Sequence, residues 1–209
     1  MKFYDCLTAP SPRRVRMFIA EKGIDIPVVE VDLANLEQHS DAFEVTNPHR
    51  TVPVLILDDG RSLTSSTGII QFLELAYPEP PLLGKDPFEC GLIADLNWRI
   101  EQEGFLAVGE AFRNRAKSFA NRALPGRHQH AQIPELVARG KKRTEEFFNW
   151  LDQQIDGNDY IAGNDFSVAD ITALVTIDFA RWIKMEPDAS LANLHRWYKN
   201  VSSRPSARL

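Results

Sequence analysis

The decisive stretch of this sequence is Asn47-Pro48-His49-Arg50-Thr51-Val52-Pro53-Val54-Leu55, followed closely by Leu63-Thr64-Ser65-Ser66-Thr67-Gly68-Ile69. A proline directly before an apolar run predicts a strand entered through a bend, because proline has no N–H to give to a sheet. A cis peptide bond is tolerated almost only before proline, and a cis Val52-Pro53 bond would turn the N–H and C=O of Val52 outward. The serine- and threonine-rich stretch precedes an apolar helical pattern, so its hydroxyls and free N–H groups would face a carboxylate. The two stretches together predict a site for a small extended peptide.

The elements around these stretches predict a thioredoxin-like α/β unit over residues 1–78. Ser11 is expected to be the N-cap of the first helix, with Pro12 at its first position and Gly23 just after its end. Asp59-Gly60 predicts the turn of a hairpin. The expected order is strand 2–7, helix 11–22, strand 26–31, short helix 40–45, strand 54–57, strand 62–63 and helix 69–77.

A proline-rich run separates this unit from the remainder of the chain. Pro78-Glu79-Pro80-Pro81 is the strongest linker signal, and we assign the linker to residues 79–86. Strand patterns cease after it, so residues 87–209 are predicted to form an all-helical domain. Its expected helices span residues 87–104, 110–124, 134–155, 167–184 and 191–203, with a loop over 123–133.

One helix start in the second domain carries a specific signature. Ser167-Val168-Ala169-Asp170 fits a capping box, in which the serine hydroxyl and the acid satisfy each other's backbone amides. Phe166 and Ile171 stand where a hydrophobic staple forms. We interpret this motif as a folding device rather than a functional site.

Composition excludes several classes of protein. The chain has 209 residues with a net charge of −5, which argues against a nucleic-acid partner. It has no run of about 18 apolar residues, so no membrane span is expected. Asp5 interrupts the region where a signal peptide would be apolar. Cys6 and Cys90 are too few for a disulfide framework, and His128 and His130 lack a third ligand nearby, so we expect no metal and a reducing, cytoplasmic setting.

Four motifs carry a family resemblance that covers nearly the whole chain. Its motifs are Ala9-Pro10-Ser11-Pro12-Arg13-Arg14-Val15, the stretch from Asn47 to Leu55, Ser66 at a helix start, and Phe166-Ser167-Val168-Ala169-Asp170. In order and spacing the sequence resembles the cytosolic glutathione transferases of the bacterial type. The resemblance implies a thioredoxin-like domain that binds glutathione as co-substrate, a helical domain that binds a small electrophile, and a homodimer.

The resemblance also implies roles for particular residues in glutathione binding. Val52, beside a cis Pro53, resembles the residue whose backbone pairs with the cysteinyl part of glutathione. Ser66 resembles the hydroxyl residue that binds the γ-glutamyl carboxylate. Arg50 stands where family members place a residue near the glycyl end, and that end has a further candidate contact in Gln38 or His39.

Two positions depart from the family pattern. Ser65 replaces the glutamate or glutamine that usually precedes the serine matched by Ser66, so it brings no charge for the γ-glutamyl amino group. Ala9 occupies the usual position of the thiol-activating serine. Ser11 and Thr8 are the neighbouring hydroxyls that would take over this catalytic role.

The chemistry requires glutathione as a thiolate near neutral pH. An unperturbed thiol has a pKa of about 8.5, and each unit of depression needs about 1.4 kcal/mol. A helix N-terminus and one hydroxyl supply stabilisation of that order without a general base. Arg13, the best candidate among three neighbouring arginines, would add positive potential. The alternative for Arg13, Arg14 and Arg16 is exposure to solvent or pairing with acids such as Asp95, Glu101 or Glu103.

The second-substrate pocket is expected in the helical domain. Phe105, Phe112, Arg113 and Phe119 offer an aromatic and cationic lining, although aromatic residues at helical spacing also form cores. The leading hypothesis is conjugation of glutathione to small, partly apolar electrophiles, with glutathione-dependent reduction of peroxides or disulfides as a further activity. The alternative is a non-catalytic binding or regulatory protein with the same fold.

Overall fold

A four-stranded sheet with strand order β2-β1-β3-β4 forms the centre of the first of two structural units. The structure is a computed structural model, and it describes residues 1–209. The first unit comprises residues 1–80, 124–129 and 209, and the second comprises residues 81–123 and 130–208. The domain limits drawn from the sequence at residues 78 and 87 stay predictions.

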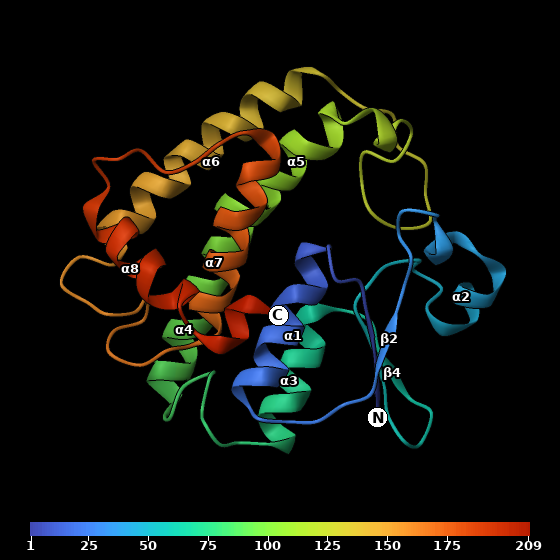
Figure 1. Cartoon of the computed structure of the whole chain (residues 1–209), viewed down its shortest axis with the longest axis horizontal. Helices are drawn as coiled ribbons and strands as arrows, with labels where there is room; N and C mark the ends of the chain where they lie inside the picture. Colours follow the sequence, from blue (N-terminus) through green and yellow to red (C-terminus); the bar gives the residue numbers. More distant parts are fainter. The chain divides into compact units, whose positions relative to one another are not determined.

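The first unit has the predicted order of elements. β1 is parallel to β2 and antiparallel to β3, and β3 is antiparallel to β4, which confirms the thioredoxin-like prediction. α1 and α3 lie side by side (Figure 1). The bounds are β1 Lys2–Asp5, α1 Pro10–Glu21, β2 Val28–Glu30, a 3₁₀ turn Glu37–His39, α2 Asp41–Thr46, β3 Val54–Ile56, β4 Ser62–Leu63 and α3 Ser66–Ala76.

The start of α1 differs from the prediction. Ala9 is the N-cap residue, Pro10 is the first helical residue, and Ser11 lies inside the first turn without capping it. The reason is that proline is favoured at the first helical position, where no N–H is needed, so Pro10 rather than Pro12 opens the helix. Ser11 as N-cap is therefore wrong.

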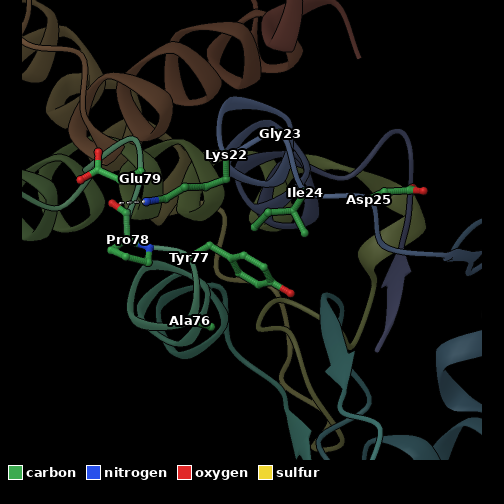
Figure 2. Close-up of a pocket in the computed structure, with 8 residues that line it drawn as sticks. All are labelled: Lys22, Gly23, Ile24, Asp25, Ala76, Tyr77, Pro78 and Glu79. Atoms are coloured by element: carbon green, nitrogen blue, oxygen red, sulfur yellow. Dashed lines mark hydrogen bonds between the residues drawn. The ribbon is translucent and has the colours of Figure 1, made fainter.

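The carboxyl ends of α1 and α3 are joined by a buried lysine. The side chain of Lys22 is fully buried, and its Nζ lies 2.5 Å from a carboxylate oxygen of Glu74. The same ammonium donates to the carbonyls of Pro78 and Pro80, at 3.3 and 2.5 Å. Figure 2 shows the Lys22 side chain reaching Pro78 beside the shallow pocket at this end of the unit. The ammonium thus holds the first part of the proline-rich run.

Residues 124–129 belong to the first unit although they are distant from it in sequence. Gly126 has a φ of +113°, which favours glycine, and a Cβ there would lie 3.6 Å from the carbonyl oxygen of His49. The segment therefore packs close to the stretch that precedes β3.

The second unit is helical, as predicted, but two of its helices have different limits. α4 and α5 are joined by a π-helical segment, so residues 87–115 run without the break expected between 104 and 110, and α5 ends well before 124. Gly104 does not end a helix because it permits close packing: a Cβ there would lie 2.9 Å from the ring of Phe147. The bounds are α4 Pro87–Arg99, the π segment Ile100–Phe105, α5 Leu106–Arg115, α6 Glu135–Gln154, α7 Val168–Ala180 and α8 Ala192–Ser202.

The capping box at α7 is confirmed. Asp170 is fully buried, and its carboxylate accepts hydrogen bonds from Ser167 N, Ile161 N and Trp197 Nε1, at 3.0, 3.0 and 2.8 Å. The Ser167 hydroxyl also donates to it at 3.1 Å. Burial raises the pKa of Asp170 to about 6, although these donors oppose the shift. One carboxylate thus ties the start of α7 to the preceding loop and to α8.

We predict that Asp170→Asn lowers the free energy of unfolding by about 2–3 kcal/mol at pH 7, because an amide leaves buried donors unpaired. The folded-state pKa of about 6 lies above the ordinary value of 3.8, so the folded state takes up this proton first. The proton-linked part of the contribution of Asp170 to stability therefore grows as the pH falls from 7 to 4 and is lost as the pH rises through 6, whereas the hydrogen bonds that its carboxylate accepts remain at pH 7. Urea denaturation at several pH values measures both effects. Asp165→Asn, the same change at an exposed residue, should alter stability by under about 1 kcal/mol, and an equal loss in both variants would contradict the prediction.

α5 and α6 approach closely at a glycine (Figure 1). Gly140 in α6 is buried, and a Cβ there would lie 2.7 Å from the carbonyl oxygen of Ala107 and 2.8 Å from the amide nitrogen of Ala111. Both atoms belong to the backbone of α5, so they have little freedom to move. The absence of a side chain at residue 140 therefore sets the spacing of the two helices.

We predict that Gly140→Ala destabilises the protein by about 1–3 kcal/mol, because the added methyl group must push two helix backbones apart. Gly91→Ala is the matched control, since Gly91 is an exposed residue inside α4 with nothing within 4 Å of the new Cβ. That substitution should stabilise the protein by about 0.5–1 kcal/mol. Thermal and urea unfolding of the two variants should move in opposite directions.

Candidate functional site

The register of the sheet brings the predicted site segments of the first unit to one edge. Tyr4 pairs with Val54 in antiparallel register, so the carboxyl end of β1 lies beside the amino end of β3. Leu63 pairs with Leu55, so the chain leaving β4 runs toward the same edge. Asp5 pairs with Glu30 in parallel register, which brings the chain after β2 there too. Four segments therefore lie at the same edge of the sheet: residues 6–11, 31–39, 50–53 and 64–67.

The predicted cis peptide bond between Val52 and Pro53 is present. Val52 is half-buried, and neither its N–H nor its C=O makes a backbone hydrogen bond. The preceding turn is held by Asn47, which is fully buried. Its side-chain amide donates to the carbonyl of Thr51 at 2.7 Å, and its oxygen accepts from the N–H of His49 at 2.9 Å. Asn47 thus fixes the turn that leaves the backbone of Val52 unpaired.

The start of α3 offers unpaired N–H groups. Ser65 is the N-cap residue, and its hydroxyl oxygen accepts from the N–H of Gly68 at 3.1 Å. Ser66 is the first helical residue, is buried, and donates from its hydroxyl to the carbonyl of Ser11 at 3.2 Å. The N–H groups of Ser66 and Thr67 make no hydrogen bond within the protein. These donors and the helix dipole favour an anion at this end.

The start of α1 offers few N–H groups to a ligand. Pro10 and Pro12 have no N–H, so the N–H of Ser11 is the one amide of the first two helical positions that can donate to a ligand. The Ser11 hydroxyl also lacks a hydrogen-bond partner. Thr8 is exposed, and its hydroxyl lies 3.5 Å from the sulfur of buried Cys6. Ser11 lies next to Ser66, because its carbonyl accepts the hydrogen bond from the Ser66 hydroxyl.

The residues expected from the sequence to bind the glycyl carboxylate of glutathione lie in two of these segments, Gln38 and His39 in residues 31–39 and Arg50 in residues 50–53. Arg50 has a φ of +55°, and its guanidinium donates to a carboxylate oxygen of Glu44 at 2.7 Å. Arg50 therefore holds the pKa of Glu44 below its usual value. The side-chain oxygen of Gln38 is buried without a hydrogen-bond partner, and His39 ends the 3₁₀ turn. The sequence did not indicate Glu44 as a competitor for Arg50.

The three arginines of α1 have different surroundings. Arg16 forms an ion pair with Asp5 at 2.6 Å, so the acids suggested from the sequence are not its partners. Several acids in the sequence fit the charge of Arg16 equally well, so its partner could be identified only from the three-dimensional arrangement. Arg14 is buried, which corrects the expectation of a solvent-exposed cation. Arg13 is half-buried in the first turn of α1.

In the second unit, Phe105 and Phe112 belong to an aromatic cluster. Phe112 contacts Phe119 and the rings of α7 and the turn after it, with centroid distances of 5.1 to 5.6 Å. Arg113 donates to the carbonyls of Arg122 and Ala123, and burial lowers its pKa to about 10. The guanidinium also lies over the Phe119 ring at 4.4 Å. Arg113 is thus engaged in holding the loop after α5, and pocket lining by Phe105, Phe112 and Arg113 stays a prediction.

Two further findings concern ligands and membranes. No group of three or more histidine, cysteine, aspartate or glutamate side chains is placed to hold a metal ion. None of the helices combines the length and the apolar character that crossing a bilayer requires.

The fold and this edge define a two-domain protein with a thioredoxin-like unit followed by a helical unit, the class to which glutathione transferases belong. The amino-terminal domain of glutathione S-transferases matches residues 3–81, and the carboxy-terminal domain matches residues 100–205. The chain belongs to the glutathione S-transferase family, a family of glutathione-dependent transferases.

Relatives with known names agree with this assignment. Glutathione S-transferase 2 of Saccharomyces cerevisiae is 31% identical over 213 residues, covering 100% of this chain and 88% of the relative. The crystal structure of Gtt2 from the same yeast has a TM-score of 0.90, with 31% identity over 100% of this chain and 99% of that one. A glutathione S-transferase domain-containing protein from Marinobacter aquaeolei VT8 has a TM-score of 0.90 at 33% identity, covering 99% of each chain.

We predict that Ser65→Ala lowers the free energy of unfolding by about 1 kcal/mol, because the variant loses the hydroxyl that caps α3. Ser62→Ala is the control, since Ser62 is exposed on the neighbouring strand β4, and its effect should stay within about 0.5 kcal/mol. Urea denaturation measures both. Equal stabilities of the two variants would show that Ser65 does not act as a cap.

Proposed function

We propose that this protein conjugates the thiolate of glutathione to small, partly apolar electrophiles. The observation that carries the proposal is the meeting, at one sheet edge, of the unpaired backbone of Val52 with the free N–H groups at the starts of α1 and α3. A tripeptide with two carboxylates and a thiol has the groups that such an edge would bind.

Each end of glutathione has a proposed partner at this edge. The backbone of Val52, beside Pro53, pairs with the cysteinyl residue. The N–H groups of Ser66 and Thr67 bind the γ-glutamyl carboxylate, supported by the position of these donors at a helix N-terminus. Ser65 is committed to capping α3, so it contributes to this part of the site by ordering those donors rather than by charge.

The glycyl carboxylate is proposed to bind near Arg50, with Gln38 or His39 as a further contact. Glu44 is already paired with Arg50, so the ligand carboxylate shares the guanidinium with it. Gln38 would contact this carboxylate through its Nε2 amide, because the buried side-chain oxygen is an acceptor and cannot pair with a carboxylate.

Ser11 is the proposed catalytic residue, with Thr8 as the alternative. Ser11 has both a free hydroxyl and a free N–H at the start of α1, and two hydrogen bonds plus the helix dipole favour a thiolate over a thiol. Arg13 adds positive potential in the same turn. In the reaction, the thiolate attacks an electrophilic carbon, a C–S bond forms, and the leaving group departs with the electron pair of the broken bond.

The second substrate is proposed to contact the aromatic residues Phe105 and Phe112, with Arg113 and the loop it holds alongside. We propose that the protein acts as a cytoplasmic homodimer without a metal, and the exposed Phe88 and Trp98 on α4 support an interface between subunits. Glutathione-dependent reduction of peroxides or disulfides would use the same thiolate. A non-catalytic binding role is the second candidate, favoured by Ala9 and Ser65 at positions where the family has functional side chains.

We predict that glutathione binds in the millimolar range or tighter and that the protein conjugates it to 1-chloro-2,4-dinitrobenzene. Isothermal calorimetry and the absorbance of the conjugate measure the two properties. Binding without conjugation or peroxide reduction would favour the non-catalytic role. No binding at millimolar glutathione would reject the transferase and leave the non-catalytic role.

We predict that Ser11→Ala raises the pKa of the bound glutathione thiol by about one unit, because the thiolate loses a hydrogen bond worth about 1 kcal/mol. The affinity for glutathione should change little, since its two carboxylates keep their partners. A thiolate absorbance titration measures the pKa, and Thr8→Ala is the matched control. A shift in Thr8→Ala alone would move the catalytic role to Thr8.

A further inference from the structure

Arg16, a half-buried arginine of α1, holds the loop that leads into the proposed thiol site. One nitrogen of Arg16, Nη1, donates to both carboxylate oxygens of Asp5, at 2.7 and 2.6 Å. The second, Nη2, donates to the carbonyl of Leu7 at 3.1 Å. The Arg16 and Asp5 side chains are 12% and 3% exposed. The ion pair is thus shielded from solvent, where charge-assisted hydrogen bonds are strong.

The other backbone group of Leu7 is held by a second charged residue. The N–H of Leu7 donates to Oε1 of Glu30 at 2.9 Å, and Glu30 pairs with Asp5 in the sheet register. The Leu7 side chain is 61% exposed, so packing of this side chain does not hold the loop in place. Two charged side chains, one from α1 and one from β2, therefore fix both backbone groups of Leu7.

The loop between Leu7 and Ser11 is short, so the position of Leu7 determines that of the thiol-binding groups. Ala9 N donates to the carbonyl of Cys6 at 2.9 Å, which closes a turn across the loop. Ser11 follows two residues later, and its carbonyl is fixed by Ser66. A displacement at Leu7 would thus reach the Ser11 hydroxyl and N–H through four residues with few other supports.

We propose that Arg16 is a positioning residue for the thiolate: it holds Asp5 and the Leu7 carbonyl at once and so places Thr8 and Ser11 relative to Ser66. This inference rests on the proposed glutathione site. Arg16 does not contact the ligand, and Asp5 neutralises its charge, so its effect arises through geometry and not through a free positive charge.

Arginine is required for this role because its planar fork can serve two acceptors in fixed directions. A lysine at residue 16 would keep the positive charge and could pair with Asp5. Its single ammonium cannot keep the same geometry to both Asp5 and the Leu7 carbonyl. The Arg16→Lys variant therefore separates the positioning of the loop from the neutralisation of Asp5.

The test uses Arg16→Lys and Glu30→Ala, which remove the two supports of Leu7 separately. Arg61→Lys is the matched control, because Arg61 is exposed in the hairpin of the same unit and pairs only with exposed Asp59. The readouts are the pKa of the bound thiol by thiolate absorbance, the pH profile of kcat, and the Kd for glutathione by calorimetry. A purely structural loss of stability would not move the thiol pKa of the molecules that remain folded.

We expect Arg16→Lys to raise the pKa of the bound thiol by about half a unit to one unit and therefore to lower kcat at neutral pH by about three- to tenfold, because less of the bound thiol is ionised. The Kd for glutathione should stay within about twofold, since the groups that bind its carboxylates are untouched. Glu30→Ala should shift the thiol pKa in the same direction, and Arg61→Lys should change neither quantity.

The inference is overturned if folded Arg16→Lys binds glutathione with an unchanged thiol pKa and an unchanged pH profile. If Arg16→Lys does not fold, Glu30→Ala decides, and an unshifted thiol pKa in that variant overturns the inference as well. The absence of glutathione binding by the unaltered protein is a different result, because it rejects the proposed function itself.

Discussion

The hydrogen bond from the Ser66 hydroxyl to the carbonyl of Ser11 is the contact on which the candidate site depends. It joins the starts of two helices whose first amides have no partners within the protein. Because an unpaired N–H group in a partly buried place is costly, these amides need either water or an anion. The bond keeps the two sets of donors together, so a single ligand can satisfy both.

Proline governs how many donors this edge presents. Pro10 and Pro12 remove two amides from the first turn of α1, and Pro53 removes one from the start of β3. In these two proline-containing segments, the remaining free backbone groups are those of Ser11 and Val52, so they are few and well defined. The specificity of such a site for its ligand depends on missing donors as well as on those present, because every additional N–H group would require another acceptor on the ligand.

The fold was largely predictable from the sequence because its signals are local. The proline before the apolar run at Val54, the turn at Gly60 and the capping box at Ser167 each follow from backbone chemistry within a few residues, and the structure has all three elements. The break expected after Gly104 was wrong because glycine serves there for contact with Phe147, which lies far away in sequence.

The candidate site was predictable only in part. The segments around Val52 and Ser66 could be placed because proline and helix-start residues act on their own neighbourhood. The pairing of Arg16 with Asp5 could not be derived, since it depends on the register of β1 against α1, and several acids fit the charge pattern equally well. Side-chain partners across elements need the three-dimensional arrangement.

The membership of residues 124–129 in the first unit has a consequence for the architecture of the gene product. The thioredoxin-like unit is not a continuous piece of chain, because a segment that packs on it is encoded more than forty positions after Pro80. A fragment cut after the proline-rich run would lack the backbone that lies against the His49 carbonyl. The two units are thus interleaved along the sequence, and exchange of one for a homologous module would have to carry this short insert with it.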